Sequence, residues 1–268
     1  VNRKESITVE RCPVCSDAIN DTLKQISLES DEDFQFIDFR EGAAGDIQLI
    51  LRGDMPKPEA EIETDLPISM VYSSPEGSFV MVGDSTIMQQ PAGLEICASE
   101  DSFFYPNPDI YGAICSELES FLPELENECV LNLNAGTGFW SKWFAGKCKK
   151  VIAQESDERL SEDFALNLDE FDNVDLYLGA ASDVLPALKE KITAVVTETA
   201  ASGLSPAMIR MLAEKKVRHV LYIGHDSAIL ARDTARLLEL DFLLKAIIPF
   251  DNEPQTARIS TVAIFEIT

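Results

Sequence analysis

A histidine and an aspartate stand where a predicted strand ends and a predicted helix begins. The segment YIGHDSAILARD, residues 222–233, starts like a buried strand and continues like a helix, and the turn between them carries His225 and Asp226. Histidine titrates near neutral pH, so a His–Asp pair at a strand end could act as a general base. Adjacent residues of an extended strand point to opposite faces, so the two side chains meet only if the turn has already begun. The alternative is a histidine that simply fills a polar pocket.

Two glycines and a later acid indicate a nucleotide-type site. Gly136 and Gly138 follow a predicted strand at 129–133, and Glu155 follows the next predicted strand, at 151–154. Glycine lets the backbone turn sharply and lets a ligand approach it, and an acid after the second strand commonly binds ribose hydroxyls. No third glycine follows, and the sulfonium of S-adenosylmethionine brings no phosphate that would need one, so this cofactor is favoured over NAD. A glycine pair that serves only the turn is the alternative.

The elements that must position these residues alternate between strands and helices. Beyond about residue 93 the predicted helices are 109–122, 139–146, 158–168, 181–189, 205–214 and 228–240. The predicted strands are 129–133, 151–154, 174–178, 194–197, 217–223, 242–249 and 258–268. Such alternation predicts a mostly parallel sheet with helices on both faces. The last two strands resemble the closing hairpin of a methyltransferase, so we predict an α/β, Rossmann-like class I methyltransferase fold with a seven-stranded sheet.

A smaller α+β unit is expected before this region. Its predicted helix is 17–26, and its predicted strands are 34–39, 46–51, 67–72 and 77–82. The acidic stretch 53–65 has the composition of a loop, because strand-like sequence resumes directly after it. We therefore expect two domains, at 1–92 and 93–268.

The composition predicts a soluble globular protein with a large negative charge. Hydrophobic residues make up 46% and charged residues 26% of the chain, and the formal net charge is −25. No apolar run is long enough to span a bilayer, so no membrane partner is expected. Nucleic-acid binding gains free energy when Lys and Arg displace phosphate counterions, so this charge disfavours tight RNA binding and suits a basic protein partner. Two Lys-rich stretches, 142–150 and 215–218, are candidate basic patches, with solvated helix ends as the commoner explanation.

Among six cysteines, only Cys12 and Cys15 have the spacing of a metal or redox site. A structural zinc or iron–sulfur site normally needs four ligands, and no second pair is present, so no metal is predicted. Reduced thiols are typical of a cytoplasmic protein. The sequence begins at Val1 without a methionine, so we expect a fragment or a processed chain.

Several motifs together resemble the RNA (uracil-5-)-methyltransferases, which use S-adenosylmethionine to methylate tRNA and ribosomal RNA. Residues 103–107, FFYPN, resemble that family's FFQVN, and residues 132–138, NLNAGTG, resemble its DLYCGVG. Residues 230–233 match its LARD, and residues 254–262, PQTARISTV, share the frame of its PQTxHVETV. The order and spacing of these motifs are those of the family, and the resemblance is weaker over residues 12–91.

The resemblance also implies that the catalytic residues are replaced. In the family, the cysteine of YVSCNP adds to C6 of uracil, and a glutamate before the final Thr-Val removes the proton from C5. His225 stands at the position of this cysteine and Ser260 at that of the glutamate, while Arg258 replaces a family histidine. Addition to C6 needs a strongly nucleophilic thiolate, and a serine hydroxyl cannot accept the C5 proton at ordinary pH. The resemblance therefore implies that methylation of uracil C5 has been lost.

The candidate cofactor residues are partly altered too. The resemblance gives six of them: Tyr105, Asn134, Gly136, Gly138, Glu155 and Glu198. The glycines and Glu155 match the family, whereas Tyr105 replaces a glutamine, Asn134 replaces a tyrosine, and Glu198 opens ETAA in place of DPPR. S-adenosylmethionine as cofactor and RNA as partner are implied by the resemblance. The iron–sulfur cysteines and the RNA-binding barrel of the family, when present, lie upstream of the matched portion.

Three functions follow from the sequence. The favoured one is a methyltransferase-fold protein that binds S-adenosylmethionine without methylating uracil. The second is an active methyltransferase with a small-molecule or protein acceptor, suggested by the retained glycines and Glu155. The third is a non-enzymatic module that binds basic proteins, suggested by the net charge.

Overall fold

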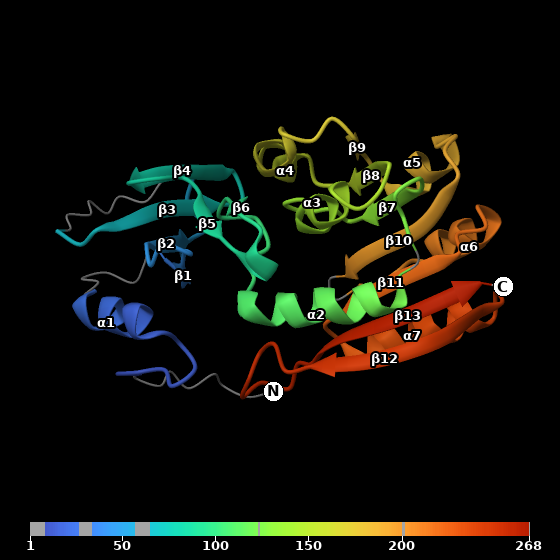
Figure 1. Cartoon of the computed structure of the whole chain (residues 1–268). Helices are drawn as coiled ribbons and strands as arrows, with labels where there is room; N and C mark the ends of the chain where they lie inside the picture. The colour runs from blue at the N-terminus through green and yellow to red at the C-terminus, as the bar shows by residue number, and fades with distance from the viewer. Residues whose placement is uncertain (1–8, 27–33, 57–64, 123, 200–201, 268) are drawn as a thin grey trace. The chain divides into compact units, whose positions relative to one another are not determined.

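The computed structural model describes residues 9–26, 34–56, 65–122, 124–199 and 202–267. The chain forms two compact units, Val1–Met88 and Gln89–Thr268, each of which is described by itself (Figure 1). In the described part, none of the helices is both long enough and apolar enough to cross a membrane.

The N-terminal unit is a four-stranded sheet with one helix. Helix α1 (Asp17–Gln25) is capped by Ser16, whose hydroxyl accepts a hydrogen bond from the Ile19 N–H at 3.2 Å. The strands, in their order across the sheet, are β1 (Phe36–Glu41), β2 (Ile47–Arg52), β3 (Ile68–Ser74) and β4 (Gly77–Val82). Strands β2 and β3 are parallel, and the outer pairs are antiparallel. Buried side chains of β2 and β3, with Ile19 of α1 packed against them, form the core.

The C-terminal unit is built on a seven-stranded sheet of order β12-β13-β11-β10-β7-β8-β9. The strands are β7 (Cys129–Leu133), β8 (Lys150–Glu155), β9 (Val174–Leu178), β10 (Ile192–Thr199), β11 (His219–Gly224), β12 (Phe242–Phe250) and β13 (Ser260–Ile267). Strands β7 to β11 are mutually parallel, and β13 is antiparallel to both of its neighbours. The predicted mostly parallel sheet, closed by an antiparallel hairpin, is therefore confirmed.

Helices cover both faces of this sheet (Figure 1). They are α2 (Pro108–Phe121), α3 (Phe139–Ala145), α4 (Ser161–Leu168), α5 (Ala181–Ala187), α6 (Pro206–Glu214) and α7 (Ser227–Leu238). Successive strand residues point to opposite faces, so the neighbours Val130 and Leu131 belong to different cores. The core of Val130 includes side chains of α2 and α3, and the core of Leu131 includes side chains of α5, α6 and α7.

The structure adds short elements that the sequence pattern did not predict. Two three-residue strands, β5 (Ile87–Gln89) and β6 (Ile96–Ala98), form a sheet of their own, and a 3-10 turn, η1, spans Pro91–Gly93. A second 3-10 turn, η2 (Glu158–Leu160), replaces the start of the predicted helix 158–168. Three residues are too few for alternation to be recognised. Most of the predicted loop 53–65 lies outside the described residues.

The strand order reverses beside β7. From β7 the chain continues to β8 and β9 on one side, and then to β10 and β11 on the other. The connections after β7 and β10 therefore leave the sheet in different directions, which is where open α/β sheets bind ligands. Gly136 and Gly138 follow β7, and Glu198 lies at the end of β10.

Candidate functional site

The loop after β7 has a backbone that requires glycine. Gly136 and Gly138 have φ angles of +56° and +92°, in the region that side chains disfavour. A Cβ at Gly138 would lie 2.4 Å from Leu168, whereas a Cβ at Gly136 would have nothing within 4 Å. Gly138 is therefore needed for packing against α4, and Gly136 leaves open space for a ligand to approach. Asn134, with φ of +55°, is exposed on the same loop.

Glu155 holds this loop from the end of β8. Its Oε2 accepts a hydrogen bond from the Gly136 N–H at 2.8 Å. Its Oε1 accepts from the N–H groups of Ser156 and Asp157 at 2.7 and 2.9 Å. An ionised carboxylate offers about four acceptor positions, so Oε2 keeps one acceptor position unused, although the residue as a whole is only 6% exposed.

Asn167 of α4 connects the glycine loop to the segment around Cys97. Its Nδ2 donates to the carbonyl oxygens of Thr137 and Cys97, both at 2.9 Å. Its Oδ1 accepts from the Cys97 N–H at 2.7 Å. The side chain is buried, so these bonds are shielded from water and fix the loop's position on α4.

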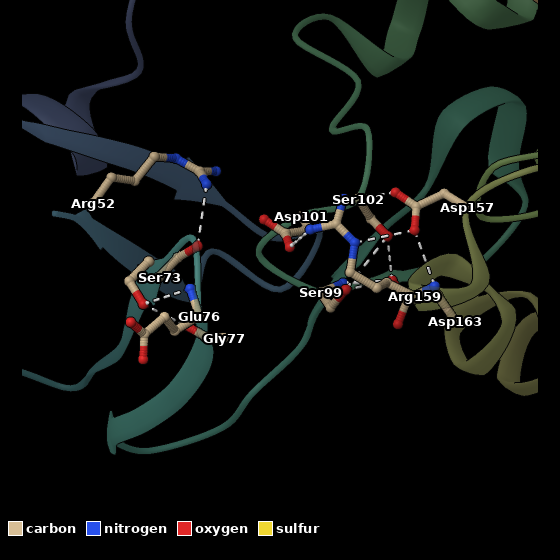
Figure 2. Close-up of polar contacts among 11 residues, drawn as sticks. Arg52, Ser73, Glu76, Gly77, Ser99, Asp101, Ser102, Asp157, Arg159 and Asp163 are labelled. Carbon is tan, nitrogen blue, oxygen red and sulfur yellow. Dashed lines mark hydrogen bonds and ion pairs between the residues drawn. The ribbon is translucent and has the colours of Figure 1, made fainter. Parts of the chain in front are cut away.

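Asp163, one turn earlier in α4, holds residues 99–102, the segment that follows Cys97 (Figure 2). Its buried carboxylate accepts from the N–H and hydroxyl of Ser99, at 2.7 and 2.8 Å, and from the hydroxyl of Ser102. Close by, Arg159 forms ion pairs with Asp101 and Asp157 at 2.7 and 2.6 Å. Residues 99–102 are thereby tied to α4, just before Tyr105.

Glu198 accepts hydrogen bonds on both of its carboxylate oxygens. Its Oε1 accepts from the Tyr111 hydroxyl at 2.5 Å and from His225 Nε2 at 2.9 Å. Its Oε2 accepts from Trp140 Nε1 at 2.8 Å. The carboxylate is therefore occupied by three donors of the protein itself.

His225 links Glu198 to Ser260. Its Nδ1 lies 2.8 Å from the Ser260 Oγ. Because an ionised carboxylate can only accept, Nε2 carries a hydrogen in either charge state of the ring. When the ring is neutral, Nδ1 therefore accepts a hydrogen bond from the serine hydroxyl.

Strand register explains why these three residues meet. Thr199 at the end of β10 lies opposite Gly224 at the end of β11, and Gly224 lies opposite Thr261 near the start of β13. Glu198, His225 and Ser260 are the respective neighbours of these residues in the sequence. Three segments that are distant in sequence therefore meet at the carboxyl ends of β10 and β11, where β13 begins.

The charges in this cluster shift the pKa values of its members. Burial lowers the pKa of His225, but the hydrogen bond and charge of Glu198 more than offset this, so the net shift is upward. Burial, and then the charge of Glu198, raise the pKa of Tyr111 well above its usual value. A charged imidazolium and a neutral phenol are therefore the forms that this carboxylate stabilises.

The order serine–histidine–glutamate is that of an activated-serine triad. Ser260 is only 3% exposed, however, so it presents little surface to a substrate. The His–Asp pair considered from the sequence does not form. Asp226 instead caps α7, where its carboxylate accepts from the N–H groups of Ala228 and Ile229, both at 2.9 Å.

Aromatic side chains surround the cluster, and one of them, Tyr111, was not foreseen. Tyr105 is buried and packs edge-on against Tyr111 and Phe103, with ring centroids 4.5 and 5.0 Å apart. Phe103 is 45% exposed, and its ring centroid lies 6.0 Å from that of His225. Sequence reasoning did not single out Tyr111 or the Trp140 bond to Glu198. The sequence did carry a signal for Tyr111, because this tyrosine lies on the buried face of the helix that follows FFYPN.

The described part places the predicted residues in two groups. Asn134, Gly136, Gly138 and Glu155 lie on or against the glycine loop. Glu198, His225 and Ser260 form the hydrogen-bonded cluster, and Tyr105 belongs to the aromatic residues beside it. Ala200 and Ala201, the end of the ETAA segment, lie outside the described residues.

Comparison with known proteins finds RNA methyltransferases among the relatives of this chain. No family model matches the chain. An uncharacterized RNA methyltransferase of Listeria innocua is 30% identical over an alignment of 223 positions, which covers 77% of this chain and 49% of that protein. The 23S rRNA (uracil(1939)-C(5))-methyltransferase RlmD of Pseudomonas savastanoi pv. phaseolicola is 23% identical and matches 99% of this chain and 62% of its own length. The chain thus spans about half the length of the first of these relatives and less than two thirds of the second.

A solved structure shares the fold. The crystal structure of Pyrococcus abyssi tRNA (uracil-54, C5)-methyltransferase in complex with S-adenosyl-L-homocysteine has a TM-score of 0.77. It covers 97% of this chain and 69% of its own chain at 18% identity. The predicted methyltransferase fold, preceded by a smaller sheet-containing unit, is confirmed.

Proposed function

Because the chain belongs to the RNA (uracil-5-)-methyltransferase family, we propose that it binds S-adenosylmethionine beside Gly136 and does not methylate C5 of uracil. The observation that carries this proposal is the closed hydrogen-bonded group of Glu198, His225 and Ser260. These residues stand where the resemblance expects the acid, the nucleophile and the base of the family.

The cluster leaves no group free to attack the pyrimidine. His225 Nε2 carries a hydrogen towards Glu198, and Nδ1, which holds the only lone pair of the neutral ring, faces Ser260. Cys115, one turn along α2 from Tyr111, is near enough for the charge of Glu198 to act on it. Burial is the main reason that its pKa is raised to about 12, so this thiol stays protonated.

The cofactor side of the site fits S-adenosylmethionine better. Three features support this: the Glu155 carboxylate lies against the glycine loop, Gly136 leaves room beside the backbone, and Asn134 is exposed. When bound, S-adenosylmethionine supplies an electrophilic methyl group. The role of the chain's own residues is to bind and orient it.

RNA is the partner that the family suggests, but three of the four lysines in the stretch 142–150 are paired with acids. In the Lys-rich stretch 142–150, Lys142 pairs with Glu170 at 3.1 Å and Lys147 with Glu119 at 2.9 Å. Lys150 pairs with two acids, at 2.8 and 2.9 Å. With a net charge of −25, these pairs argue against tight RNA binding and leave a basic protein as the alternative partner.

Calorimetry with S-adenosylmethionine and S-adenosylhomocysteine tests the cofactor half of the proposal. We expect saturable binding, because the loop geometry is already formed. Glu155→Gln should weaken it at least fivefold, whereas the exposed Glu158→Gln is the matched control and should not. Absence of heat at millimolar cofactor, with the chain shown to be folded by its tryptophan fluorescence, would contradict binding.

Tritium transfer from labelled S-adenosylmethionine to tRNA and ribosomal RNA tests the reaction half. We expect no 5-methyluridine above background. Formation of 5-methyluridine that His225→Ala abolishes would show that the histidine supports the reaction and would contradict the proposal.

A further inference from the structure

Cys12 and Cys15 are the first and fourth residues of a tight turn before α1. The Cys15 N–H donates to the Cys12 carbonyl at 3.3 Å, and Pro13 occupies the second position, where proline favours such a turn. A turn of this kind brings its end Cα atoms within about 7 Å. A disulfide needs a Cα separation of roughly 4.4 to 6.8 Å, so the backbone is compatible with one.

One buried side chain fixes the shape of this turn. Asn20 of α1 is 1% exposed, and its Oδ1 accepts from the Cys12 N–H at 2.7 Å. Its Nδ2 donates to the carbonyl oxygens of Cys12, Cys15 and Ser16 at 3.0, 3.1 and 2.8 Å. The amide thus accepts one hydrogen bond and shares its two N–H hydrogens among three carbonyl oxygens, which holds the two cysteines in place before any bond joins them.

The two thiols differ in ionisation. The backbone N–H of Val14, followed by the thiol of Cys15, lowers the pKa of Cys12. Burial, followed by the contact with Cys12, raises the pKa of Cys15. All six cysteines are described, and the remaining four have raised pKa values: Cys97, Cys115, Cys129 and Cys148. Cys12 is thus the thiol with the largest thiolate fraction near neutral pH.

We propose that Cys12 and Cys15 form a reversible dithiol–disulfide site that reacts with low-molecular-weight disulfides, separate from the methyltransferase-type site. The Cys12 thiolate attacks one sulfur of the small disulfide, which forms a mixed disulfide and releases one thiolate. Cys15 then loses its proton to solvent and attacks the Cys12 sulfur, which releases the second thiolate. The protein gives up two electrons and two protons, and the small disulfide is reduced to two thiols.

Thiol trapping on the full chain tests this proposal. The chain is equilibrated with mixtures of reduced and oxidised glutathione, quenched with N-ethylmaleimide, and mapped by peptide mass. We expect a disulfide between Cys12 and Cys15, which lowers the mass by two hydrogens. The oxidised fraction should rise through a single midpoint as the proportion of oxidised glutathione increases. Cys15→Ser should instead accumulate one glutathione on Cys12, because no second thiol can release it. Cys129→Ser is the control and should leave the midpoint unchanged.

Asn20→Asp tests the role of the clamp. Aspartate keeps the acceptor for the Cys12 N–H and loses the three donated bonds, so we expect the disulfide-to-dithiol ratio to fall about tenfold, a shift of about 30 mV. A change below twofold would contradict this role. Full alkylation of both thiols at every glutathione ratio, or zinc or iron bound through them in the purified chain, would overturn the proposal.

Discussion

At the scale of single residues, Glu198 decides what the site can do. Its donors Tyr111, Trp140 and His225 lie 87, 58 and 27 positions away in the sequence. The sequence identified His225, Ser260 and Glu198 through their motif positions. It could not show that they are bonded to one another, because that depends on the register of β10, β11 and β13. The pairing of His225 with the adjacent Asp226, which the sequence left open, does not form for a local reason: the aspartate caps the helix that starts there.

The titration of the two histidines tests the electrostatics of this cluster. His225 should titrate above the ordinary histidine pKa because of Glu198, and His219 should titrate below it, mainly because of burial. NMR of the ring carbons can follow both, since the chain has only two histidines. Glu198→Gln should lower the pKa of His225 and leave that of His219 unchanged. Equal pKa values for the two rings in the unaltered chain would contradict the described contacts.

Stability should depend on pH in opposite directions for the two histidines. A raised pKa in the folded state stabilises the fold below the unfolded-state pKa of about 6.5 and loses this effect as pH rises through the folded-state value. The unfolding free-energy difference between the unaltered chain and His225→Gln should therefore shrink between pH 6 and pH 9. For His219→Gln it should grow over the same range, since the pKa of His219 is lowered. Urea unfolding followed by tryptophan fluorescence measures both, and parallel trends would count against the assignment.

At the scale of elements, the sequence predicted the strands and helices well where hydrophobic periodicity was long. Strand β7 was expected at the residues where it occurs, and α2 within one residue at each end. Strands β5 and β6 and the turns η1 and η2 were missed, because three residues carry no recognisable period. The hydrogen bonds by which Asp163 and Asn167 hold the segment before Tyr105 were also missed, since each joins residues more than sixty positions apart in the sequence. Composition alone does not reveal such contacts.

The two glycines of the loop after β7 form a matched pair for testing its geometry. Gly136→Ala meets only the unfavourable positive φ, which costs roughly 1 to 2 kcal/mol for a residue with a side chain. Gly138→Ala meets the same strain and also Leu168 in α4, and overpacking adds about 1 to 3 kcal/mol. Urea unfolding of the C-terminal unit, which holds both tryptophans, should show Gly138→Ala as the less stable variant. Equal losses would mean that the loop does not pack on α4 as described.

At the scale of the whole molecule, charge is the dominant property. The net charge of −25 was evident from the sequence, and the ion pairs of Lys142, Lys147 and Lys150 neutralise three of the four lysines in one candidate basic patch. Which partner this charge serves does not follow from the fold, because the methyltransferase fold hosts many acceptors.

Binding of labelled tRNA, measured by fluorescence anisotropy, tests this reading of the charge. At 0.15 M salt we expect dissociation constants weaker than about 100 μM, the weak limit of ordinary non-specific binding. A lysine-rich peptide in the same buffer should bind the chain and be released at 1 M salt, where charges are screened within about 3 Å. Micromolar tRNA binding that weakens steeply with salt would show that phosphate contacts are made despite the net charge.

The central claim is that this site lacks a nucleophile for C6 of uracil, and RNA carrying 5-fluorouridine tests it most directly. Fluorine at C5 cannot be removed as a proton, so an enzyme that attacks C6 and transfers its methyl group stays covalently attached to the RNA. An active RNA (uracil-5-)-methyltransferase run on the same RNA shows that the substrate is competent. With S-adenosylmethionine present, we predict that this chain forms no covalent complex that survives denaturing electrophoresis. A covalent complex that disappears in His225→Ala would contradict the account.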